Sequence, residues 1–308
     1  MPTGQDVYVD PQLTDVSLKY KNETFVADII FPVLNVAKKT GFYFVYDKQN
    51  LRAHNSERSG VARANRVDYS LIKTPYGPLV EHSLEVPIEY DVLSMYEDPL
   101  DPRTDATETV TEMIMIEKEV KIATLLSDTT QVTQNQTNAG TSQWNDYGNS
   151  NPFQDIWAGI NIIKKFGIKP ANTLVFGQDV WIQIVNHPDF LDRIKYSELG
   201  KVTAENIKML FPGIENVVIA SAVQNTAVQG QTDSLSYIWG KNCQVLYVTP
   251  SPAIRQVTAG YTLTLDGGRK VENWDEMQVK AEFVRATDYY QQKIVAPEAI
   301  YLIKAAVA

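Results

Sequence analysis

Apolar side chains recur at helical spacing through residues 102–127, the longest periodic stretch of the chain. Asp101 precedes this stretch as a favourable N-cap, and Pro102 suits the first helical position because that position needs no N–H. A helix over the whole stretch would be about 39 Å long at roughly 1.5 Å per residue. Its apolar positions form one broad stripe: Val110, Met113, Ile114, Ile116, Val120, Ala123 and Leu126.

Strand-like segments flank this helix on both sides in the sequence. The segments 41–47 and 66–72 are rich in β-forming residues, and they predict a long two-stranded excursion. Apolar and polar residues alternate in segments 82–94 and 277–283, and segment 293–307 supplies further strands near the carboxyl end. Because neither set has enough partners alone, we expect the carboxyl-terminal strands to pair with the strands that precede the long helix.

The segment from residue 152 to about 265 has the character of a separate α/β unit. A polar, turn-rich stretch over residues 128–151 marks its start. Asn151 and Pro152 then predict the cap and first residue of a helix, and further helical stretches alternate with short apolar strands. Since this unit lies between segments that are expected to pair, we interpret it as an insertion.

A basic stretch over residues 48–66 lies at the tip of the predicted excursion. It reads KQNLRAHNSERSGVARANR and holds five basic residues and one acidic residue, in a chain with a formal net charge of -9. It has almost no large apolar side chains, so it cannot bury itself against its own core. A lone hairpin of this length is marginal in water. The stretch therefore needs a partner outside the loop.

Composition places the chain among ordinary globular proteins, since 44% of its 308 residues are hydrophobic and 21% are charged. The single cysteine, Cys243, excludes an intramolecular disulfide and a cysteine-based metal cluster, and we expect it to be buried on a strand. No apolar run approaches the roughly 20 residues that span a bilayer, and we expect no export signal. The acidic balance argues against a dedicated nucleic-acid-binding surface.

No motif predicts catalysis, a cofactor or a metal ion. His54, His82 and His187 show no helical pairing of the kind that binds zinc, and each fits a surface or packing position better. The glycine-rich phosphate-binding motifs and the serine nucleophile motif are missing from the sequence.

Acidic residues gather in two places. One group precedes the long helix, where helix capping and a solvated turn explain it better than a hard cation does. Its members are Glu97, Asp98, Asp101 and Asp105. The other group lies near His187, where a helix break explains the sequence better than acid–base catalysis does. Its members are Asp179, Asp189 and Asp192.

In their order, these parts resemble the major capsid protein of tailed double-stranded DNA bacteriophages, with the Hong Kong 97 type of fold. Local stretches are also similar to phage capsid sequences: DIIFPVLNVAKKTGFYFVY, HPDFLDRIKYSELGKVTAENIKMLF, and SYIWGKNCQVLYVT followed by GYTLTL. The resemblance covers nearly the whole chain and implies an α+β fold. The implied parts are an N-terminal arm at 1–39, an extended loop (β-hairpin) at 40–86, a peripheral domain at 87–151 and 266–308 with a spine helix at about 102–127, and an axial domain at 152–265.

In this family the extended loop lies across an adjacent subunit, so the resemblance implies that the basic stretch is an intersubunit clasp. Arginine suits this role because its planar guanidinium binds both oxygens of a carboxylate at once. The expected contact residues of the loop are Lys48, Arg52, Arg58, Arg63 and Arg66. The expected acceptors on the neighbour's spine helix are Glu108, Glu112, Glu117 and Glu119. The alternative is a solvated, flexible loop.

The resemblance implies a structural protein that self-assembles into hexamers and pentamers of an icosahedral shell. The shell would enclose double-stranded DNA without sequence-specific binding, would form in the host bacterial cytoplasm and would become the virion capsid. The implied partners, besides other copies, are a scaffolding protein, a portal and decoration proteins; no membrane, cofactor or metal is expected. Some members begin with a long helical segment that a protease removes, and no such segment is recognised here. The expectation is either a separate scaffolding protein or a mature form of the chain, and the starting Met1 favours the scaffolding protein.

Two other functions stay open at this point. An encapsulin-type nanocompartment shell shares the fold but houses cargo enzymes, so it would copurify with cargo and without DNA or a portal. A soluble α/β enzyme built on residues 152–265 would require a pocket with convergent polar groups.

Overall fold

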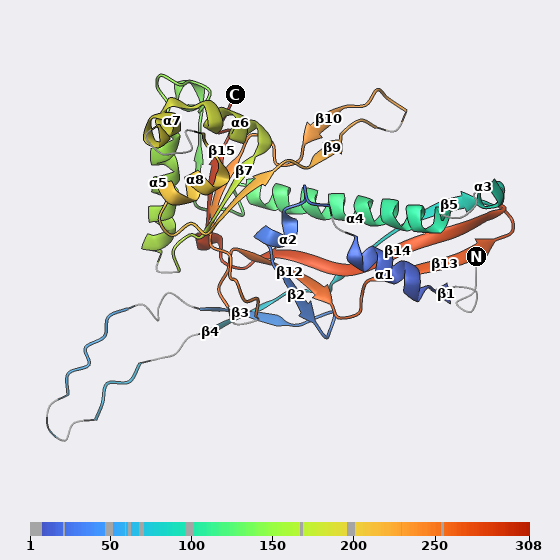
Figure 1. Cartoon of the computed structure of the whole chain (residues 1–308). Coiled ribbons are helices and arrows are strands. Elements are labelled where there is room, and N and C mark those ends of the chain that lie inside the picture. Colours follow the sequence, from blue (N-terminus) through green and yellow to red (C-terminus); the bar gives the residue numbers. More distant parts are fainter. Residues whose placement is uncertain are drawn as a thin grey trace.

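Two β-sheets and one long helix that contacts both make up the body of the protein, and a narrow two-stranded excursion projects from it (Figure 1). The computed structural model describes residues 8–20, 22–46, 52–58, 60, 63–67, 71–95, 101–166, 169–195, 201–228, 230–253 and 256–308. Helices and strands are both present, so the predicted α+β class is confirmed.

The long helix, α4 (Pro102–Ser127), begins and ends where the sequence predicts. The Asp101 side chain caps it by accepting a hydrogen bond from the backbone N–H of Arg103 at 3.1 Å. Pro102 is its first residue, as expected for a residue without an N–H donor.

α4 packs against both sheets. Val110 and Ile114, in its first half, lie in a buried cluster with side chains of the six-stranded sheet. Ile122 and Leu126, in its second half, lie in another buried cluster with side chains of the five-stranded sheet. The helix therefore holds the two sheets together along its length.

The six-stranded sheet is built around one long strand, β14 (Ala281–Ile294). All of β5 (Val80–Glu89) pairs antiparallel with it, which confirms that carboxyl-terminal strands pair with a strand that precedes α4. Along its other edge β14 pairs antiparallel with two strands. β12 (Gly260–Leu265) pairs with its carboxyl-terminal part, and β13 (Lys270–Glu276) pairs with its amino-terminal part.

The N-terminal segment lies against α4. It also supplies β1 (Tyr8–Val9) and β2 (Val33–Val36), the first and last strands in the order β1-β13-β14-β12-β2 of the six-stranded sheet. β1 pairs with β13, and β2 pairs parallel with β12. Between these strands, α1 (Pro11–Lys19) and α2 (Ala27–Ile30) contact α4. The segment thus docks on its own chain, and Pro32 stands just before an edge strand, where its missing N–H does no harm.

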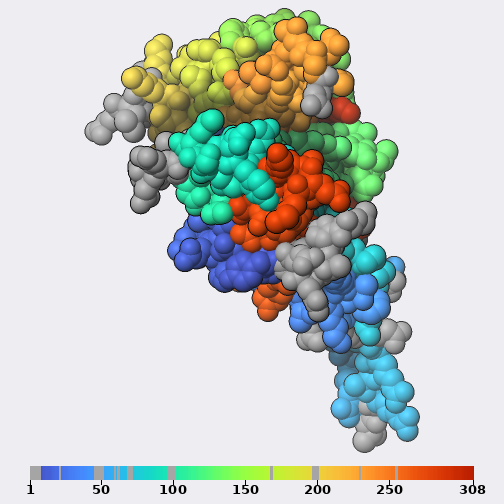
Figure 2. Space-filling view, turned by 90° about the vertical axis from the view of Figure 1, so that its right-hand side faces the viewer, coloured from blue at the N-terminus to red at the C-terminus, as the bar shows by residue number. Residues whose placement is uncertain are grey.

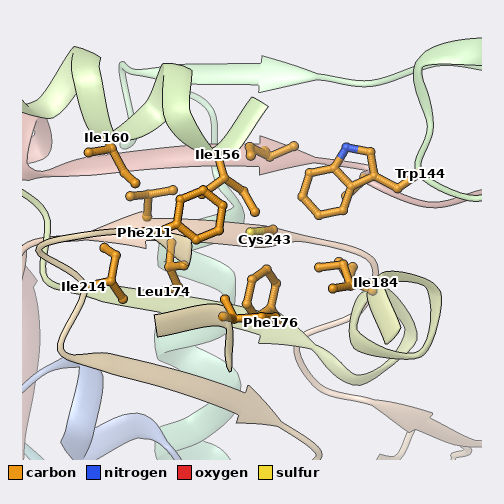
Figure 3. Close-up of a cluster of buried hydrophobic side chains, with 14 of the residues drawn as sticks. Trp144, Ile156, Ile160, Leu174, Phe176, Ile184, Phe211, Ile214 and Cys243 are labelled. Carbon is orange, nitrogen blue, oxygen red and sulfur yellow. The ribbon is translucent and has the colours of Figure 1, made fainter. Parts of the chain in front are cut away.

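The five-stranded sheet has α4 on one face and four helices on the other. Alternate residues of a strand point to opposite faces, so Val175 contacts the cluster that contains α4, whereas Leu174 and Phe176 contact the helices (Figure 3). The strand order is β6 (Asn135–Thr137), β15 (Ile300–Lys304), β11 (Cys243–Leu246), β7 (Thr173–Gly177) and β8 (Asn216–Ala220). The four helices are α5 (Pro152–Lys165), α6 (Gln178–Asn186), α7 (Pro188–Ile194) and α8 (Ala204–Leu210).

The strand pairing differs from the predicted division of the chain in three places. β15 was placed with the last segment, 266–308, but it pairs with β11 in the five-stranded sheet. β12 was placed in the α/β unit, but it pairs with β14. β5 begins at Val80, inside the predicted loop of 40–86. The reason is common to all three: periodicity identifies a strand, but it does not identify the strand's partner.

The excursion is the predicted two-stranded hairpin. β3 (Phe42–Tyr46) pairs antiparallel with β4 (Leu71–Pro75), and the described residues 52–58 and 63–67 lie away from the body. The space-filling view shows this segment clear of the rest of the protein (Figure 2). A second, smaller hairpin, β9 (Val223–Asn225) with β10 (Leu235–Tyr237), projects from the five-stranded unit on the side of α4 (Figure 1).

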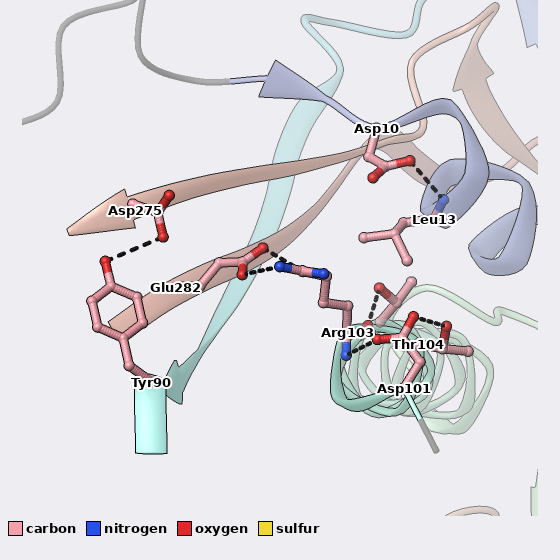
Figure 4. Close-up of polar contacts among 9 residues, drawn as sticks. Asp10, Leu13, Tyr90, Asp101, Arg103, Thr104, Asp275 and Glu282 are labelled. Carbon is pink, nitrogen blue, oxygen red and sulfur yellow. Dashed lines mark hydrogen bonds and ion pairs between the residues drawn. The ribbon is translucent and has the colours of Figure 1, made fainter. Parts of the chain in front are cut away.

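Polar contacts fasten the start of α4 to the far end of the six-stranded sheet (Figure 4). The Arg103 guanidinium donates to both carboxylate oxygens of Glu282 on β14, at 2.7 and 2.8 Å. Tyr90, the first residue of α3 (Tyr90–Met95), donates its hydroxyl to Asp275 at 3.2 Å. The bidentate pair fixes the helix in register against the sheet.

The close approach of Gly177 to Gly240 gives a test of the five-stranded unit. A Cβ atom on Gly177 would lie 2.2 Å from the Gly240 carbonyl oxygen, and backbone cannot yield as a side chain can. We expect Gly177→Ala to destabilise the chain by about 1–3 kcal/mol in urea unfolding. Gly148→Ala is the control, because its nearest neighbour would be a side-chain oxygen at 3.7 Å. Equal stability of the two variants would contradict the account.

Candidate intersubunit interface

The arginines predicted to act in the extended loop are exposed. Arg52, Arg58, Arg63 and Arg66 form no ion pair with any residue that the structure describes. Among the described residues, Arg58 makes one long hydrogen bond of 3.4 Å, to the Gly60 carbonyl oxygen. The fifth predicted contact, Lys48, lies outside the described residues.

The contacts within the loop are polar and few. The Asn65 side chain donates to the Asn55 carbonyl oxygen at 2.7 Å, which joins the two limbs of the loop. The Asn55 side chain accepts from the backbone N–H of Glu57 at 2.9 Å. All three residues are exposed, and so are the other described residues of 52–67, which bury no apolar surface against the body.

Two of the four predicted acceptors lie on an accessible face of α4. Glu108 is exposed and makes no hydrogen bond or ion pair with a described residue, and Glu112 is half-buried and accepts from the Asn22 side chain at 3.0 Å. Asp105 is also exposed, and helical spacing puts it on the same face. We call Asp105, Glu108 and Glu112 the acidic stripe. Burial, and then the negative charge of Glu112 and Glu108, raise the pKa of the nearby Tyr20 hydroxyl.

Glu117 is already paired within its own chain. One carboxylate oxygen lies 2.7 Å from Lys121 Nζ, and the other lies 3.5 Å from His82 Nδ1. Burial opposes ionisation here, but the hydrogen bond and charge of Lys121 outweigh it and lower the pKa of Glu117. An arginine from a neighbour would have to compete with Lys121 for this carboxylate.

The prediction for Glu119 is wrong, because its side chain is fully buried. It accepts hydrogen bonds from the backbone N–H groups of Val26 at 3.1 Å and Ala27 at 2.8 Å, and from Trp239 Nε1 at 2.6 Å. Burial raises the pKa of the Glu119 carboxyl. A neighbour's arginine cannot reach a carboxylate enclosed in this way.

Helical spacing gave a signal for this burial that the sequence analysis missed. Position 119 stands three, four and seven residues before Ile122, Ala123 and Leu126, all of which are buried on α4. A residue at these spacings shares their face of the helix. Glu119 was grouped with the other glutamates by its charge, although its position placed it in the buried stripe.

His187 caps α7, and its contacts with Ser150 and Asp189 are not those of a catalytic triad. His187 Nδ1 accepts the backbone N–H of Asp189 at 3.1 Å, so the neutral ring carries its proton on Nε2, 3.1 Å from Ser150 Oγ. A catalytic histidine needs an unprotonated Nε2 to take the proton of the serine. Ser150 instead donates its hydroxyl to the Asp146 carbonyl oxygen at 2.6 Å.

The other candidates for chemistry occupy ordinary structural positions. His54 is exposed in the loop, and His82 stacks on Tyr290 with 4.0 Å between ring centroids. Cys243 is buried on β11, as expected, and burial raises the pKa of its thiol. Among the described residues, no group of three or more histidine, cysteine, aspartate or glutamate side chains could hold a metal ion. Glu97 and Asp98 lie outside those residues.

Comparison with known proteins identifies the family. No protein-family model matches the chain. The chain is 30% identical to the major capsid protein of Burkholderia phage BcepMu over 302 aligned residues. The aligned region covers 96% of this chain and 95% of that relative. The chain belongs to the family of phage major capsid proteins. The major capsid protein of Pseudomonas phage JBD67 is 24% identical over 244 residues, which are 78% of this capsid protein and 77% of that relative.

Solved structures show that this capsid protein has the phage capsid fold of the Hong Kong 97 type. A phage-related protein from Bordetella bronchiseptica RB50 matches with a TM-score of 0.77 at 23% identity, over 97% of each chain. The capsid of cyanophage P-SCSP1u matches with a TM-score of 0.61 at 10% identity, over 94% of this chain and 90% of that one.

An encapsulin shares the fold less closely. The SrpI encapsulin of Synechococcus elongatus PCC 7942 matches with a TM-score of 0.52 at 11% identity, over 92% of this chain and 88% of that one. The sequence relatives are phage capsid proteins, so the capsid function is better supported than a nanocompartment. This capsid protein is therefore a structural component of the virion. No described helix is long and apolar enough to cross a membrane.

The contacts of Glu119 predict a large loss of stability when its carboxylate is removed. Glu119→Ala would leave three buried N–H donors without an acceptor, so we expect it to destabilise the capsid protein by about 3–5 kcal/mol. Urea unfolding measures this change. Glu108→Ala is the matched control on the same helix, and because Glu108 is exposed we expect an effect within about 0.5 kcal/mol. Similar losses in both variants would show that the buried contacts of Glu119 contribute little.

Proposed function

We propose that this capsid protein assembles into hexamers and pentamers of an icosahedral shell that encloses double-stranded DNA, and that its extended loop clasps the adjacent subunit. The loop and the acidic stripe are different surfaces of one chain. When one patch binds a different patch on the next copy, a ring forms if the rotation closes. Rings of six and five then tile a closed shell.

The observation that carries this proposal is the charge of the two surfaces. The loop presents four exposed arginines without ion pairs among the described residues, and the acidic stripe presents carboxylates without a cationic partner there. An arginine fork meets a carboxylate in two parallel hydrogen bonds. Each exposed pair contributes at most about 1 kcal/mol, so the clasp works through several pairs together.

The acceptors in this proposal differ from those expected from the sequence. Glu108 and Glu112 remain, and Asp105 joins them because it lies on the same face of α4. Glu119 is excluded by its burial, and Glu117 is engaged with Lys121.

The parts of the chain fit the layout of this capsid family as follows. The segment before Gly41 is the arm, the excursion is the extended loop, the six-stranded sheet with α4 is the peripheral domain, and the five-stranded sheet with its helices is the axial domain. In the host bacterial cytoplasm a scaffolding protein, a portal and decoration proteins would join the assembly, whereas the contacts that build rings and shells form between copies of this chain and need no other protein. The chain would act without catalysis, and its net charge of -9 suits a wall that does not adhere to the enclosed DNA.

Reversing two charges in the loop tests the clasp. In the double variant Arg58→Glu, Arg63→Glu, attraction to the acidic stripe becomes repulsion, so we expect the critical concentration for shell formation to rise about tenfold or more. Sedimentation velocity of purified protein measures this concentration, and circular dichroism checks that the subunit remains folded.

The matched control is Lys164→Glu, Lys165→Glu, which makes the same charge change at exposed positions at the end of α5. We expect it to assemble like the wild type. Adding Glu108→Arg and Glu112→Arg to the loop variant restores opposite charges, so we expect it to recover shells. Shells of unchanged stability from the loop variant would refute the clasp.

A further inference from the structure

The β9–β10 hairpin carries an exposed apolar face that the proposed clasp does not use. Val223 stands opposite Tyr237 in the strand register, and Leu235 follows on the same face because side chains alternate along a strand. Their exposed fractions are 42%, 37% and 72% respectively. The other face carries the polar pair Gln224 and Ser236. The hairpin is therefore amphipathic, and its apolar face is left largely uncovered by its own chain.

Polar contacts, rather than burial, give this hairpin its shape. The Asn225 side chain accepts from the backbone N–H groups of Ala227 and Ser234, both at 3.0 Å, and donates to Asp233 at 2.8 Å. Thr226 N–H donates to the Ser234 carbonyl oxygen at 2.8 Å. A hairpin fixed in this way where its two strands end presents its apolar face in a set geometry, which lowers the entropy lost on binding.

An open recess adjoins the hairpin where it meets the body of the protein. Leu235 and Tyr237 also line this recess of about 600 Å³, together with Asp179, Lys241 and Asn242. The hairpin and the recess thus form one continuous surface at the edge of the five-stranded unit, where side chains of a partner can enter.

The composition of the hairpin points to a protein partner. Residues 222–238 include one charged residue, Asp233, and no lysine or arginine. The adjoining recess adds Lys241 and Lys304 beside Asp179, which is too few basic residues for binding to nucleic acid, so this surface fits a protein better than DNA. A cluster of apolar and aromatic side chains with few charges is typical of the buried centre of a protein interface.

The size of the apolar face indicates which protein binds it. Val223, Leu235 and Tyr237 together expose a few hundred Å², well below the roughly 800 Å² per partner that a stable independent interface buries. A partner held by this face must therefore also be held elsewhere. In a shell built from one chain, an adjacent copy meets that condition, because the clasp already binds it.

We propose that the apolar face of the β9–β10 hairpin docks on an adjacent copy of the capsid protein. The inference rests on the proposed self-assembly and adds to it a second, apolar contact that is distinct from the charged clasp. Because apolar contacts are not screened by salt, this contact would persist at ionic strengths that weaken the clasp.

A charge placed on each face of the hairpin tests the inference. Leu235→Glu would bury a carboxylate at the contact, so we expect the critical concentration for shell formation by the purified chain to rise at least about tenfold. Gln224→Glu places a carboxylate on the polar face, at a position that does not line the recess, and we expect a change within about twofold. Because Leu235 is exposed in the subunit, the subunit should stay folded, which circular dichroism verifies.

The outcomes separate this inference from the proposed function. Wild-type shells with an equal critical concentration for Leu235→Glu would overturn the docking contact and leave self-assembly intact. A wild-type chain that forms no shells would contradict both. Only copies of the chain are present in this experiment, so an effect on assembly cannot come from another protein.

Thiol labelling gives a second measurement that does not disturb assembly. Leu235→Cys should react with a maleimide about tenfold more slowly in shells than in dissociated subunits, whereas Gln224→Cys on the polar face should change little. Cys243 is buried, so its background reaction is low. Equal labelling of Leu235→Cys in shells and in subunits would overturn the contact. Protection of this cysteine from the maleimide only after a second protein is added would also overturn it.

Discussion

The buried carboxylate of Glu119 is the contact on which the arrangement of the whole subunit depends. It lies on α4, accepts two backbone N–H groups at the start of α2, and accepts the indole N–H of Trp239 beside the five-stranded sheet. A buried carboxylate is tolerated only when its hydrogen bonds are satisfied, so these three parts of the chain must meet there. The N-terminal segment, the long helix and the five-stranded unit are thereby held in one relative position.

That fixed arrangement determines where the interaction surfaces point. The inward face of α4 joins both sheets, which leaves the acidic stripe accessible on another face of the same helix. The extended loop and the β9–β10 hairpin project from the body as narrow, exposed elements (Figure 1). This arrangement suits a shell subunit, because the packed body holds the projecting loop and hairpin in place. Each of these elements can then bind a surface of an adjacent copy.

Local structure could be read from the sequence, whereas long-range pairing could not. Asp101 and Pro102 predicted the start of α4, because capping depends on residues within one turn of the helix. The partner of β15 lies far away in the sequence, and its apolar run fits either sheet. In the candidate interface, the charge of the loop was readable, but grouping Glu119 by charge ignored its place in the buried stripe.

Cryo-electron microscopy of the chain expressed alone tests the central claim most directly. The account predicts closed shells in which residues 52–66 of one subunit lie over α4 of the adjacent subunit, with arginine side chains beside Glu108 and Glu112. A chain that remains monomeric, or shells in which the loop extends into solvent away from the adjacent α4, would contradict it.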